Sequence, residues 1–297
     1  MLNVENIVKY YKKTKGVENL SFKLNSGKAL GIIGINGSGK TTTFRVLLGL
    51  LKADSGKMTF NNKELAKHPA TLLGYLPEER SLYRDLTLVE HVLFLGKLKK
   101  VNEEDILKRL DKLLVELKIS KYKYTKINKL SKGNQQKVQI ICALIHDPEI
   151  IILDEPLSGL DVINVELLKR LINKLKYDGK YILLSSHQFE HIEEFCDDLI
   201  ILKNGDVQYY GSVEDLINMS KHYYLIVDKD IGIKYLHNNN IIDSKISGNE
   251  ILLQFESKEI LNNIFRQILE KEDYKNISIK QPSIEMVVKE NSLIWKI

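Results

Sequence analysis

The sequence predicts an α/β fold followed by a small α+β domain, and three observations support this prediction. A glycine-rich loop at residues 34–41 lies between a short apolar run, 29–33, and a segment with apolar residues at helical spacing, 42–48. Strand-like and helix-like segments alternate again after Ile145, which implies a parallel sheet. Beyond about residue 221 the composition shifts to Asn, Ile, Lys and Tyr, and no catalytic motif follows.

The glycine-rich loop fills the pattern G-x-x-x-x-G-K-[ST], the P-loop that cradles the phosphates of a nucleotide. Between a strand and a helix, unpaired backbone N–H groups and the helix dipole converge on an anion, and glycine lets the backbone approach it closely. We predict that Lys40 reaches the β- and γ-phosphates and that the Thr41 hydroxyl binds Mg²⁺. The predicted contacts to the nucleoside triphosphate are Asn36, Gly37, Ser38, Gly39, Lys40, Thr41 and Thr42.

A second motif supplies carboxylates. The apolar run 150–153 has the character of a strand buried on both faces, and it ends in Asp154 and Glu155, the form of a Walker B segment. Asp154 is placed to hold Mg²⁺ opposite the phosphate loop, directly or through water. Glu155 is placed to polarise a water for attack on the γ-phosphate. The sequence therefore predicts hydrolysis of the triphosphate as well as binding.

Residues 130–137, Leu-Ser-Lys-Gly-Asn-Gln-Gln-Lys, resemble the signature of the ATP-binding cassette (ABC) family, which reads LSGGQ-x-Q-R. The matching residues are Leu130, Ser131, Gly133 and Gln136. The family's glycine, glutamine and arginine are replaced by Lys132, Asn134 and Lys137. Ser131 can cap a helix expected from about Asn134 to Ile145, which leaves N–H groups free for an anion, and the charge of Lys132 is compatible with phosphate. The resemblance implies that Ser131, Lys132 and Gly133 bind ATP.

Further segments agree with this family. The Ser-Gly-Leu-Asp segment ending at Asp161 matches its D-loop, which implies that Asp161 belongs to the nucleotide site. The Ser-Ser-His segment ending at His187 matches its switch loop, which implies that His187 contacts the γ-phosphate and orients the attacking water. Tyr11 aligns with the aromatic that stacks on adenine, although Tyr10 is adjacent and an aromatic on an edge strand needs no ligand. The remaining histidines receive no functional assignment: His68, His91, His146, His191, His222 and His237.

The glutamine of the family's Q-loop is replaced. After the segment 74–77, Gly-Tyr-Leu-Pro, the chain has Glu78. A carboxylate can offer oxygen to Mg²⁺ and to the attacking water as the amide does, so we assign Glu78 as a metal ligand. The following residues, 79–83, look like those of bacterial exporter-type subunits whose permease is a separate chain.

The resemblance covers about residues 1–220, and it implies a P-loop NTPase cassette. This cassette would have a mixed sheet, an antiparallel β-subdomain from residues 1–28 and a helical subdomain at about 87–145. It implies that Ser131 and Gly133 complete the site of a facing chain, so that two chains, expected to be a homodimer, enclose two ATP molecules. An integral membrane permease would be the second partner, and the chain would contact the membrane through it. The chain would then lie peripherally on the cytoplasmic face.

Two alternatives belong to other functional classes. One is an ABC-type ATPase that acts on ribosomes or DNA, but such proteins usually carry two cassettes or coiled-coil insertions, and we expect no nucleic-acid partner here. The other is a partner that binds ATP without hydrolysing it, against which Glu155 and His187 argue. A turnover assay distinguishes the latter from an ATPase.

The composition agrees with this interpretation. The 297 residues are 43% hydrophobic and 28% charged, as in a globular protein, with no 18-residue apolar run and no signal-peptide pattern. The two cysteines, Cys142 and Cys196, lack metal-site spacing, which favours a reducing compartment. The net charge of +5 is no argument for nucleic acid. The segment 118–126, lysines interleaved with aromatics, favours a solvated loop; base stacking and attraction to an anionic membrane remain open.

The end of the chain, 221–297, predicts a small α+β domain of possible ferredoxin-like type. An amphipathic helix is expected over 257–271 and a closing helix over 282–289. The expected strands are 222–227, 241–246, 251–255 and 277–279.

Overall fold

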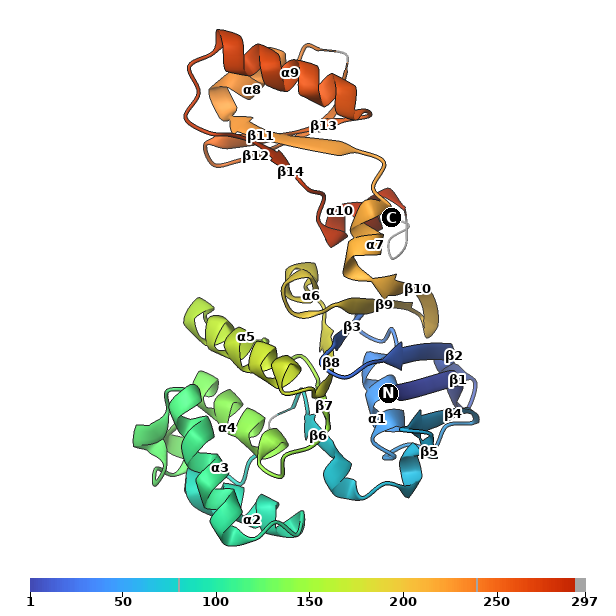
Figure 1. The fold of residues 1–297 in the computed structure, drawn as a ribbon, viewed down its shortest axis with the longest axis vertical. Helices are drawn as coiled ribbons and strands as arrows, with labels where there is room; N and C mark the ends of the chain where they lie inside the picture. The colour runs from blue at the N-terminus through green and yellow to red at the C-terminus, as the bar shows by residue number, and fades with distance from the viewer. Residues whose placement is uncertain (80, 239, 292–297) are drawn as a thin grey trace. The chain divides into compact units, whose positions relative to one another are not determined.

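The computed structural model describes residues 1–79, 81–238 and 240–291. It divides into two compact units, Met1–Ser212 and Val213–Ile297 (Figure 1). The expected boundary at residue 220 is therefore too late. The reason is that α7 (Val213–Asn218) packs against α10 (Ile284–Glu290), so it belongs to the second unit and not to the cassette.

The first unit is built on one ten-stranded mixed sheet in the order β5-β4-β1-β2-β10-β9-β3-β8-β7-β6. Its antiparallel part consists of β1 (Leu2–Tyr11), β2 (Thr14–Leu24), β4 (Ser55–Phe60) and β5 (Lys63–Glu64). The other part consists of β3 (Ala29–Ile33), β6 (Leu73–Leu76), β7 (Ile150–Leu153), β8 (Tyr181–Ser186), β9 (Asp198–Lys203) and β10 (Asp206–Ser212).

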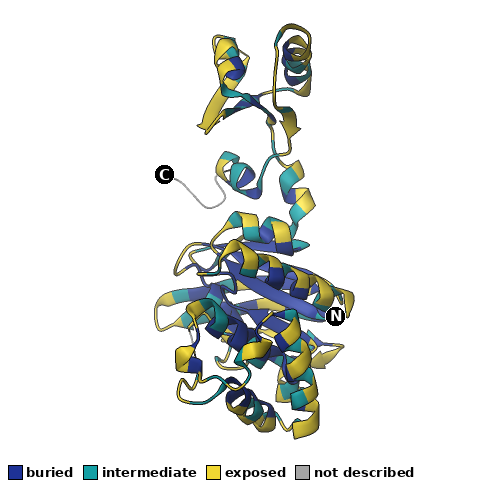
Figure 2. Cartoon of the chain, turned by 90° about the vertical axis from the view of Figure 1, so that its left-hand side faces the viewer, coloured by how far each residue is buried: buried dark blue, intermediate teal, exposed yellow. Residues whose placement is uncertain are grey.

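The central strands of this sheet are parallel and buried. Strands β6, β7, β8, β3 and β9 run in one direction, as the strand–helix alternation predicts, and β10 turns back against β9. All residues of β3, β7 and β8 are buried, which explains why β3, β7 and residues 181–184 of β8 form continuous apolar runs (Figure 2). The carboxyl ends of β3, β7 and β8 therefore lie next to one another at one edge of the sheet.

The helices of the first unit form two sets. Three of them follow or flank the parallel strands: α1 (Lys40–Leu47), α5 (Val162–Tyr177) and α6 (Phe189–Phe195). Three form the helical subdomain, seen as one group beside β6 in Figure 1: α2 (Leu88–Leu98), α3 (Glu103–Glu116) and α4 (Lys132–Leu144). Short 3₁₀ turns occupy Leu65–Lys67, Ala70–Leu72, Ser120–Tyr122 and Ile127–Lys129.

Local caps start the helices of this subdomain. Thr87 and Glu90 form a reciprocal capping box at α2, and Asn102 caps α3 by accepting from the backbone N–H of Asp105, as expected for that residue. Ser131 caps α4, which begins at Lys132 and so two residues before the expected start. In the described residues, no helix is both long enough and apolar enough to cross a bilayer.

The second unit confirms the predicted α+β domain. Its sheet has four strands, and two helices connect them. In chain order the elements are β11 (Tyr223–Asp228), α8 (Lys229–Tyr235), β12 (Ile241–Ser247), β13 (Glu250–Phe255), α9 (Lys258–Lys271) and β14 (Ile277–Lys280). The strand order is β12-β13-β11-β14, and all neighbours are antiparallel. This element order is the split βαβ arrangement of ferredoxin-like domains. Helix α8 was not predicted, because its seven residues are too few to show a clear period.

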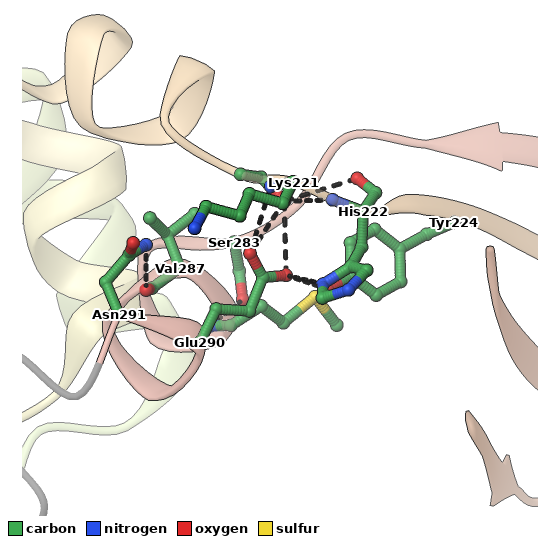
Figure 3. A network of polar contacts seen from close by, with 9 residues as sticks. Lys221, His222, Tyr224, Ser283, Val287, Glu290 and Asn291 are labelled. Carbon is green, nitrogen blue, oxygen red and sulfur yellow. Dashed lines mark hydrogen bonds and ion pairs between the residues drawn. The ribbon is translucent and has the colours of Figure 1, made fainter. Parts of the chain in front are cut away.

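A half-buried carboxylate ties α10 to the start of β11 (Figure 3). Glu290 accepts hydrogen bonds from the Tyr224 hydroxyl, from Ser220 Oγ at 3.1 Å and from the backbone N–H of Lys221 at 3.2 Å, and His222 Nδ1 lies 3.1 Å away. Burial alone would raise the pKa of Glu290, but these partners hold it below its ordinary value. The closing helix is thereby fixed within the second unit.

Candidate nucleotide-binding site

The P-loop is a tight turn between β3 and α1. Gly37 and Gly39 have φ values of 80° and 110°, a conformation that glycine adopts without strain. A side chain at Gly39 could not fit, since a Cβ there would lie 2.4 Å from the backbone oxygen of Gly16. The loop is therefore shaped by contact with the antiparallel part of the sheet as well as by its own sequence.

Lys40 is folded into this loop. Its ammonium donates to the backbone oxygen of Gly34 at 2.7 Å and to that of Ile35 at 3.3 Å, and the residue is buried. The Ser38 hydroxyl is also buried, and among the described residues it has no hydrogen-bond partner. Asn36 and Gly37 are exposed, while Thr41 and Thr42 are half-buried at the first turn of α1. The predicted phosphate contacts thus lie on one short segment with a cation at its centre.

Asp154 and Glu155 follow β7 directly and are held by a residue of the neighbouring strand. The Ser185 hydroxyl donates to Asp154 Oδ1 at 2.6 Å and accepts from the backbone N–H of Glu155 at 2.9 Å. Glu155 has a left-handed φ of 48°, which is uncommon for a non-glycine residue. The sequence analysis predicts no positioning role for Ser185, which occurs there only within the Ser-Ser-His segment. The available signal was a serine at the end of an apolar strand.

The electrostatics of Asp154 show that the charged residues converge here. Asp154 is 1% exposed, and burial raises the pKa of its carboxyl. The negative charges of Glu78 and Glu155 raise this pKa further, whereas the Ser185 hydrogen bond and the Lys40 ammonium act in the opposite direction. Lys40, Glu78 and Glu155 therefore lie within electrostatic reach of Asp154, and the four residues come from three segments of the chain.

His187 is paired with Glu155. Its Nδ1 lies 2.9 Å from Glu155 Oε2, and its side chain is 52% exposed while that of Glu155 is 9% exposed. The imidazole of His187 thus extends from the carboxylate of Glu155 toward solvent, where it is accessible to a phosphate group. The structure brings the two residues assigned to catalysis together, although they are 32 positions apart.

The geometry distinguishes the two tyrosines at the end of β1. The Tyr11 hydroxyl lies 3.3 Å from Thr42 Oγ1, beside the P-loop, and 42% of the residue is exposed. The Tyr10 hydroxyl instead donates to Glu18 at 2.9 Å. Tyr11 is therefore the aromatic side chain available to a nucleotide base next to the phosphate loop.

The signature segment lies close to the first turn of α5, which follows the D-loop of its own chain. The Ser131 hydroxyl accepts from the backbone N–H of Asn134 at 3.3 Å, and a Cβ at Gly133 would lie 3.3 Å from Asn164 Nδ2. Both carboxylate oxygens of Asp161 are used in capping α5, by the backbone N–H and the side-chain amide of Asn164. In the described chain, no hydrogen bond joins Ser131, Lys132 or Gly133 to the P-loop residues. The signature and the P-loop are therefore separate surfaces within one chain.

The donor set fits Mg²⁺. Asp154 Oδ2 is buried and, among the described residues, lacks a partner, so an oxygen ligand is free at the position where a cation would compensate the acids. Mg²⁺ prefers oxygen and usually keeps several waters and substrate phosphates, with only one or two carboxylates from the protein. The described residues contain no group of three or more His, Cys, Asp or Glu that could hold a metal alone, which is compatible with this sparse donor set.

A phosphate loop, a strand-end pair of acids and a histidine bonded to the second acid define a P-loop nucleoside triphosphatase with a helical subdomain. Residues 17–158 match the family model described as ABC transporter. The chain is 44% identical to the ABC transporter ATP-binding protein MJ1023 of Methanocaldococcus jannaschii, over 86% of this chain and 91% of the relative. It is 35% identical to YhaQ of Bacillus subtilis over 96% of both chains. The chain belongs to the ABC transporter family, as an ATP-binding subunit, and it is an ATPase.

Solved structures agree with this assignment. The ATP-binding subunit of an ABC transporter has a TM-score of 0.68 and 33% identity, and the match covers 73% of this chain and 92% of that one. A dimeric post-hydrolysis state of the cassette MJ0796, bound to ADP and Pi, has a TM-score of 0.63 and 26% identity, over 71% and 98% of the two chains. Cassettes of this family thus bind nucleotide and dimerise.

Proposed function

We propose that this chain drives an exporter whose permease is a separate polypeptide, and that it works as an Mg²⁺-dependent homodimer on the cytoplasmic face of the membrane. The pairing of Glu155 with His187 beside the P-loop is the observation that supports a hydrolytic role best. Exporter-type residues after Glu78 support the direction of transport.

Each residue has a defined part in the proposed reaction. The P-loop amides and Lys40 bind the phosphates, after Lys40 exchanges its carbonyl partners for phosphate oxygens. Glu155 accepts the proton of the attacking water, and His187 orients Glu155 and contacts the γ-phosphate. Ser185 positions Asp154 and Glu155. Mg²⁺, held by Thr41, Asp154 and Glu78, would neutralise charge on the β- and γ-phosphates.

The separation of the signature from the P-loop supports a homodimer in which each chain completes the other's site. Ser131→Arg places bulk and charge where the facing triphosphate would bind. We expect ATP binding by the isolated chain to persist and ATP-dependent dimerisation to disappear, measured by size-exclusion chromatography with ATP. Ser120→Arg, at an exposed 3₁₀ turn, is the matched control. An unchanged dimer fraction in Ser131→Arg would contradict the shared site.

A groove of about 600 Å³ between the sheet and the helical subdomain supports the permease contact. It is lined mainly by apolar side chains from β6, α2 and α4, and it includes Pro77, the residue before Glu78. A segment seated there would touch the loop that carries Glu78, which lies within electrostatic reach of Asp154. Movement of the loop that carries Glu78 during hydrolysis would then move the segment of the membrane partner in contact with it.

The test uses two exposed apolar residues on neighbouring helices. Leu98 lines the groove and is 64% exposed, whereas Val115 on α3 does not line it and is 68% exposed. In cells that contain the native partner, Leu98→Glu should move the chain from the membrane fraction to the soluble fraction, and Val115→Glu should not. Equal membrane retention of both variants would contradict docking in the groove.

A further inference from the structure

The strand β12 forms one edge of the sheet in the second unit (Figure 1). In the described chain its one neighbour is the antiparallel strand β13, and residues 242–247 are all exposed. An edge strand presents a row of backbone N–H and C=O groups to which another strand can pair. The side chains of β12 then decide which strand fits.

The backbone of β12 is regular where this edge is free. The register shift against β13 lies between Ile241 and Asp243, so regular pairing extends from Asp243 to Ser247. In an antiparallel ladder, the N–H and C=O of every second residue point away from the neighbouring strand. The N–H of Ser244 donates to Asp243 Oδ1 at 2.7 Å, which identifies Ser244 as one of the outward-facing residues.

Two residues of opposite charge flank Ser244 on one face of the strand. Asp243 lies opposite Gln254 and Lys245 lies opposite Leu252, so both side chains project from the same face of the sheet. Among the described residues, neither Asp243 nor Lys245 has an ion-pair partner. Charges on an edge strand normally discourage pairing, so their arrangement has to be compared with each possible register.

Pairing of β12 with its own copy allows only a few registers. A two-fold axis perpendicular to the sheet keeps each residue on its own face, so the axis passes through a residue. With the axis at Ser244, Asp243 of each chain lies directly opposite Lys245 of the other. An axis one residue earlier places Asp243 opposite itself, and an axis one residue later places Lys245 opposite itself. Opposite charges in these positions stabilise a pair and like charges destabilise it, so the charges select the register centred on Ser244.

We propose that β12 pairs with β12 of a second copy of this chain, antiparallel and centred on Ser244, and joins the two four-stranded sheets into one. The N–H of Ser244 then exchanges the Asp243 carboxylate for the backbone oxygen of Ser244 in the other chain, and the carboxylate pairs with Lys245. Ile246, which is 50% exposed, comes to lie opposite Ile242 of the other chain, which is 44% exposed. Such an isologous contact closes at two copies.

The proposed contact involves no nucleotide. It would hold two chains together whether or not ATP is bound, and would thereby raise the effective concentration of each cassette for the other. This consequence rests on the homodimer proposed above, whereas the strand pairing itself does not.

Cysteine cross-linking of the full chain, in EDTA and without nucleotide, tests the register. Directly opposite Cα atoms of a hydrogen-bonded antiparallel pair are about 5.5 Å apart, within the roughly 4.4–6.8 Å that a disulfide spans. Oxidation with diamide should therefore link Ser244→Cys into a dimer. Ser247→Cys is the matched control: this exposed serine lies three residues from the axis, so its two copies would be about 20 Å apart. The wild-type chain, treated alongside, accounts for the native Cys142 and Cys196.

Charge reversal tests the pairing of side chains, with the dimer measured by sedimentation velocity without nucleotide. Lys245→Asp places carboxylates opposite each other at both symmetric positions, so the dissociation constant of the dimer should rise about tenfold. The double variant Asp243→Lys, Lys245→Asp exchanges the two charges and should restore the wild-type constant. Lys258→Asp reverses the same charge at an exposed lysine of α9 and should change nothing.

Four outcomes overturn the inference. Equal cross-linking of Ser244→Cys and Ser247→Cys would mean that the strands do not pair about Ser244. Failure of the double exchange to restore the dimer would mean that Asp243 and Lys245 do not meet across the axis. Species larger than a dimer would mean that β12 joins another edge, such as β14, in an open array. A nucleotide-free chain that stays monomeric would remove the contact and leave the ATP-dependent homodimer untouched.

Discussion

The nucleotide site and the groove both contain buried polar atoms without partners in the described residues, but the two places differ in the charged groups around these atoms. Of the seven such atoms in the described residues, six lie in these two places: Ser38 Oγ and Asp154 Oδ2 at the phosphate loop, and four atoms of His91, Gln139 and His146 in the groove. At the nucleotide site the unpaired atoms stand beside an ammonium and several carboxylates, which suits phosphate and a cation. In the groove they belong to neutral groups in an apolar lining, which suits a protein segment.

The largest expected effect concerns chemistry at the charged site. Glu155→Gln keeps the shape of the side chain but removes the proton acceptor, so phosphate release should fall by about 10²–10⁴-fold while ATP binding persists. Glu149→Gln is the matched control, because this exposed glutamate precedes the same strand at its other end. Substantial hydrolysis by Glu155→Gln would exclude this residue as the base.

The next effect concerns binding at the same site. Lys40→Ala removes the cation of the phosphate loop, so turnover should be lost and ATP affinity should fall roughly tenfold to a hundredfold, as for a lost charged hydrogen bond. Isothermal titration calorimetry measures the affinity, and circular dichroism checks that the chain is folded. Lys52→Ala, at an exposed lysine after α1, should behave as wild type. Wild-type affinity in Lys40→Ala would contradict the assignment of the P-loop.

A smaller effect is expected from neutralising the buried acid. Asp154→Asn should raise the melting temperature of the nucleotide-free chain by about 2–4 °C near pH 8, the size of about 1 kcal/mol, because burial disfavours the charge. The pKa of Asp154 is raised in the folded chain, so the folded state keeps a proton that the unfolded chain releases. The Asp154 carboxyl therefore stabilises the folded wild-type chain below about pH 4, and this contribution to the free energy of unfolding is lost as the pH rises through the raised pKa of Asp154.

The rise in melting temperature caused by Asp154→Asn should accordingly become smaller as the pH falls toward 4, because the wild-type carboxyl is then neutral like the asparagine amide. Thermal melts from pH 4.5 to pH 8 measure this dependence. The same variant should lose the extra stabilisation by Mg²⁺ with ATP. A gain independent of pH would mean that the charge of Asp154 is not the cause.

An effect of the same size is expected at the neutral site, and its pH dependence has the opposite sign. His91→Leu replaces an unpaired buried ring by an apolar group of similar size and should raise the melting temperature by about 2–4 °C. Burial lowers the pKa of His91, so below pH 6.5 the unfolded wild-type chain takes up a proton that the folded chain resists. The gain should therefore grow as the pH falls toward 5.5.

His237→Leu is the control for this series, because His237 is exposed. A loss of stability in His91→Leu at all pH values would show that the His91 ring is held by an interaction that outweighs its missing hydrogen bonds, and the contrast between the two sites would then fail.

The residues of the charged site could be located from the sequence because each one lies in a short contiguous motif at a strand end. Lys40, Asp154 and His187 follow or precede recognisable apolar runs, and a parallel sheet necessarily gathers such ends. The assignment of Tyr11 in place of the adjacent Tyr10 depended on the family resemblance alone, because β1 contains register irregularities that shift which side chain faces the phosphate loop.

The groove was not predicted from the sequence, and the reason differs from that for the tyrosines. His91, Gln139 and His146 lie on different parts of the helical subdomain, and each alone resembles an ordinary helix or loop residue that needs no ligand. Their common property, a missing partner, depends on tertiary packing. The short strands β4 and β5 were also missed, because the residues of Ser55–Phe60 are mostly polar and only Phe60 is buried.

The close contact of Gly39 with Gly16 has a consequence for the rate of nucleotide binding. The backbone N–H of Gly205 also donates to the backbone oxygen of Ser38 at 2.9 Å, so the phosphate loop is held by two other segments of the chain. A phosphate loop fixed in this way is preorganised: it adopts its ATP-binding conformation before ATP binds. In a stopped-flow experiment, the association rate should then rise linearly with ATP concentration in a single phase, whereas a loop that first had to order itself would give a rate that levels off.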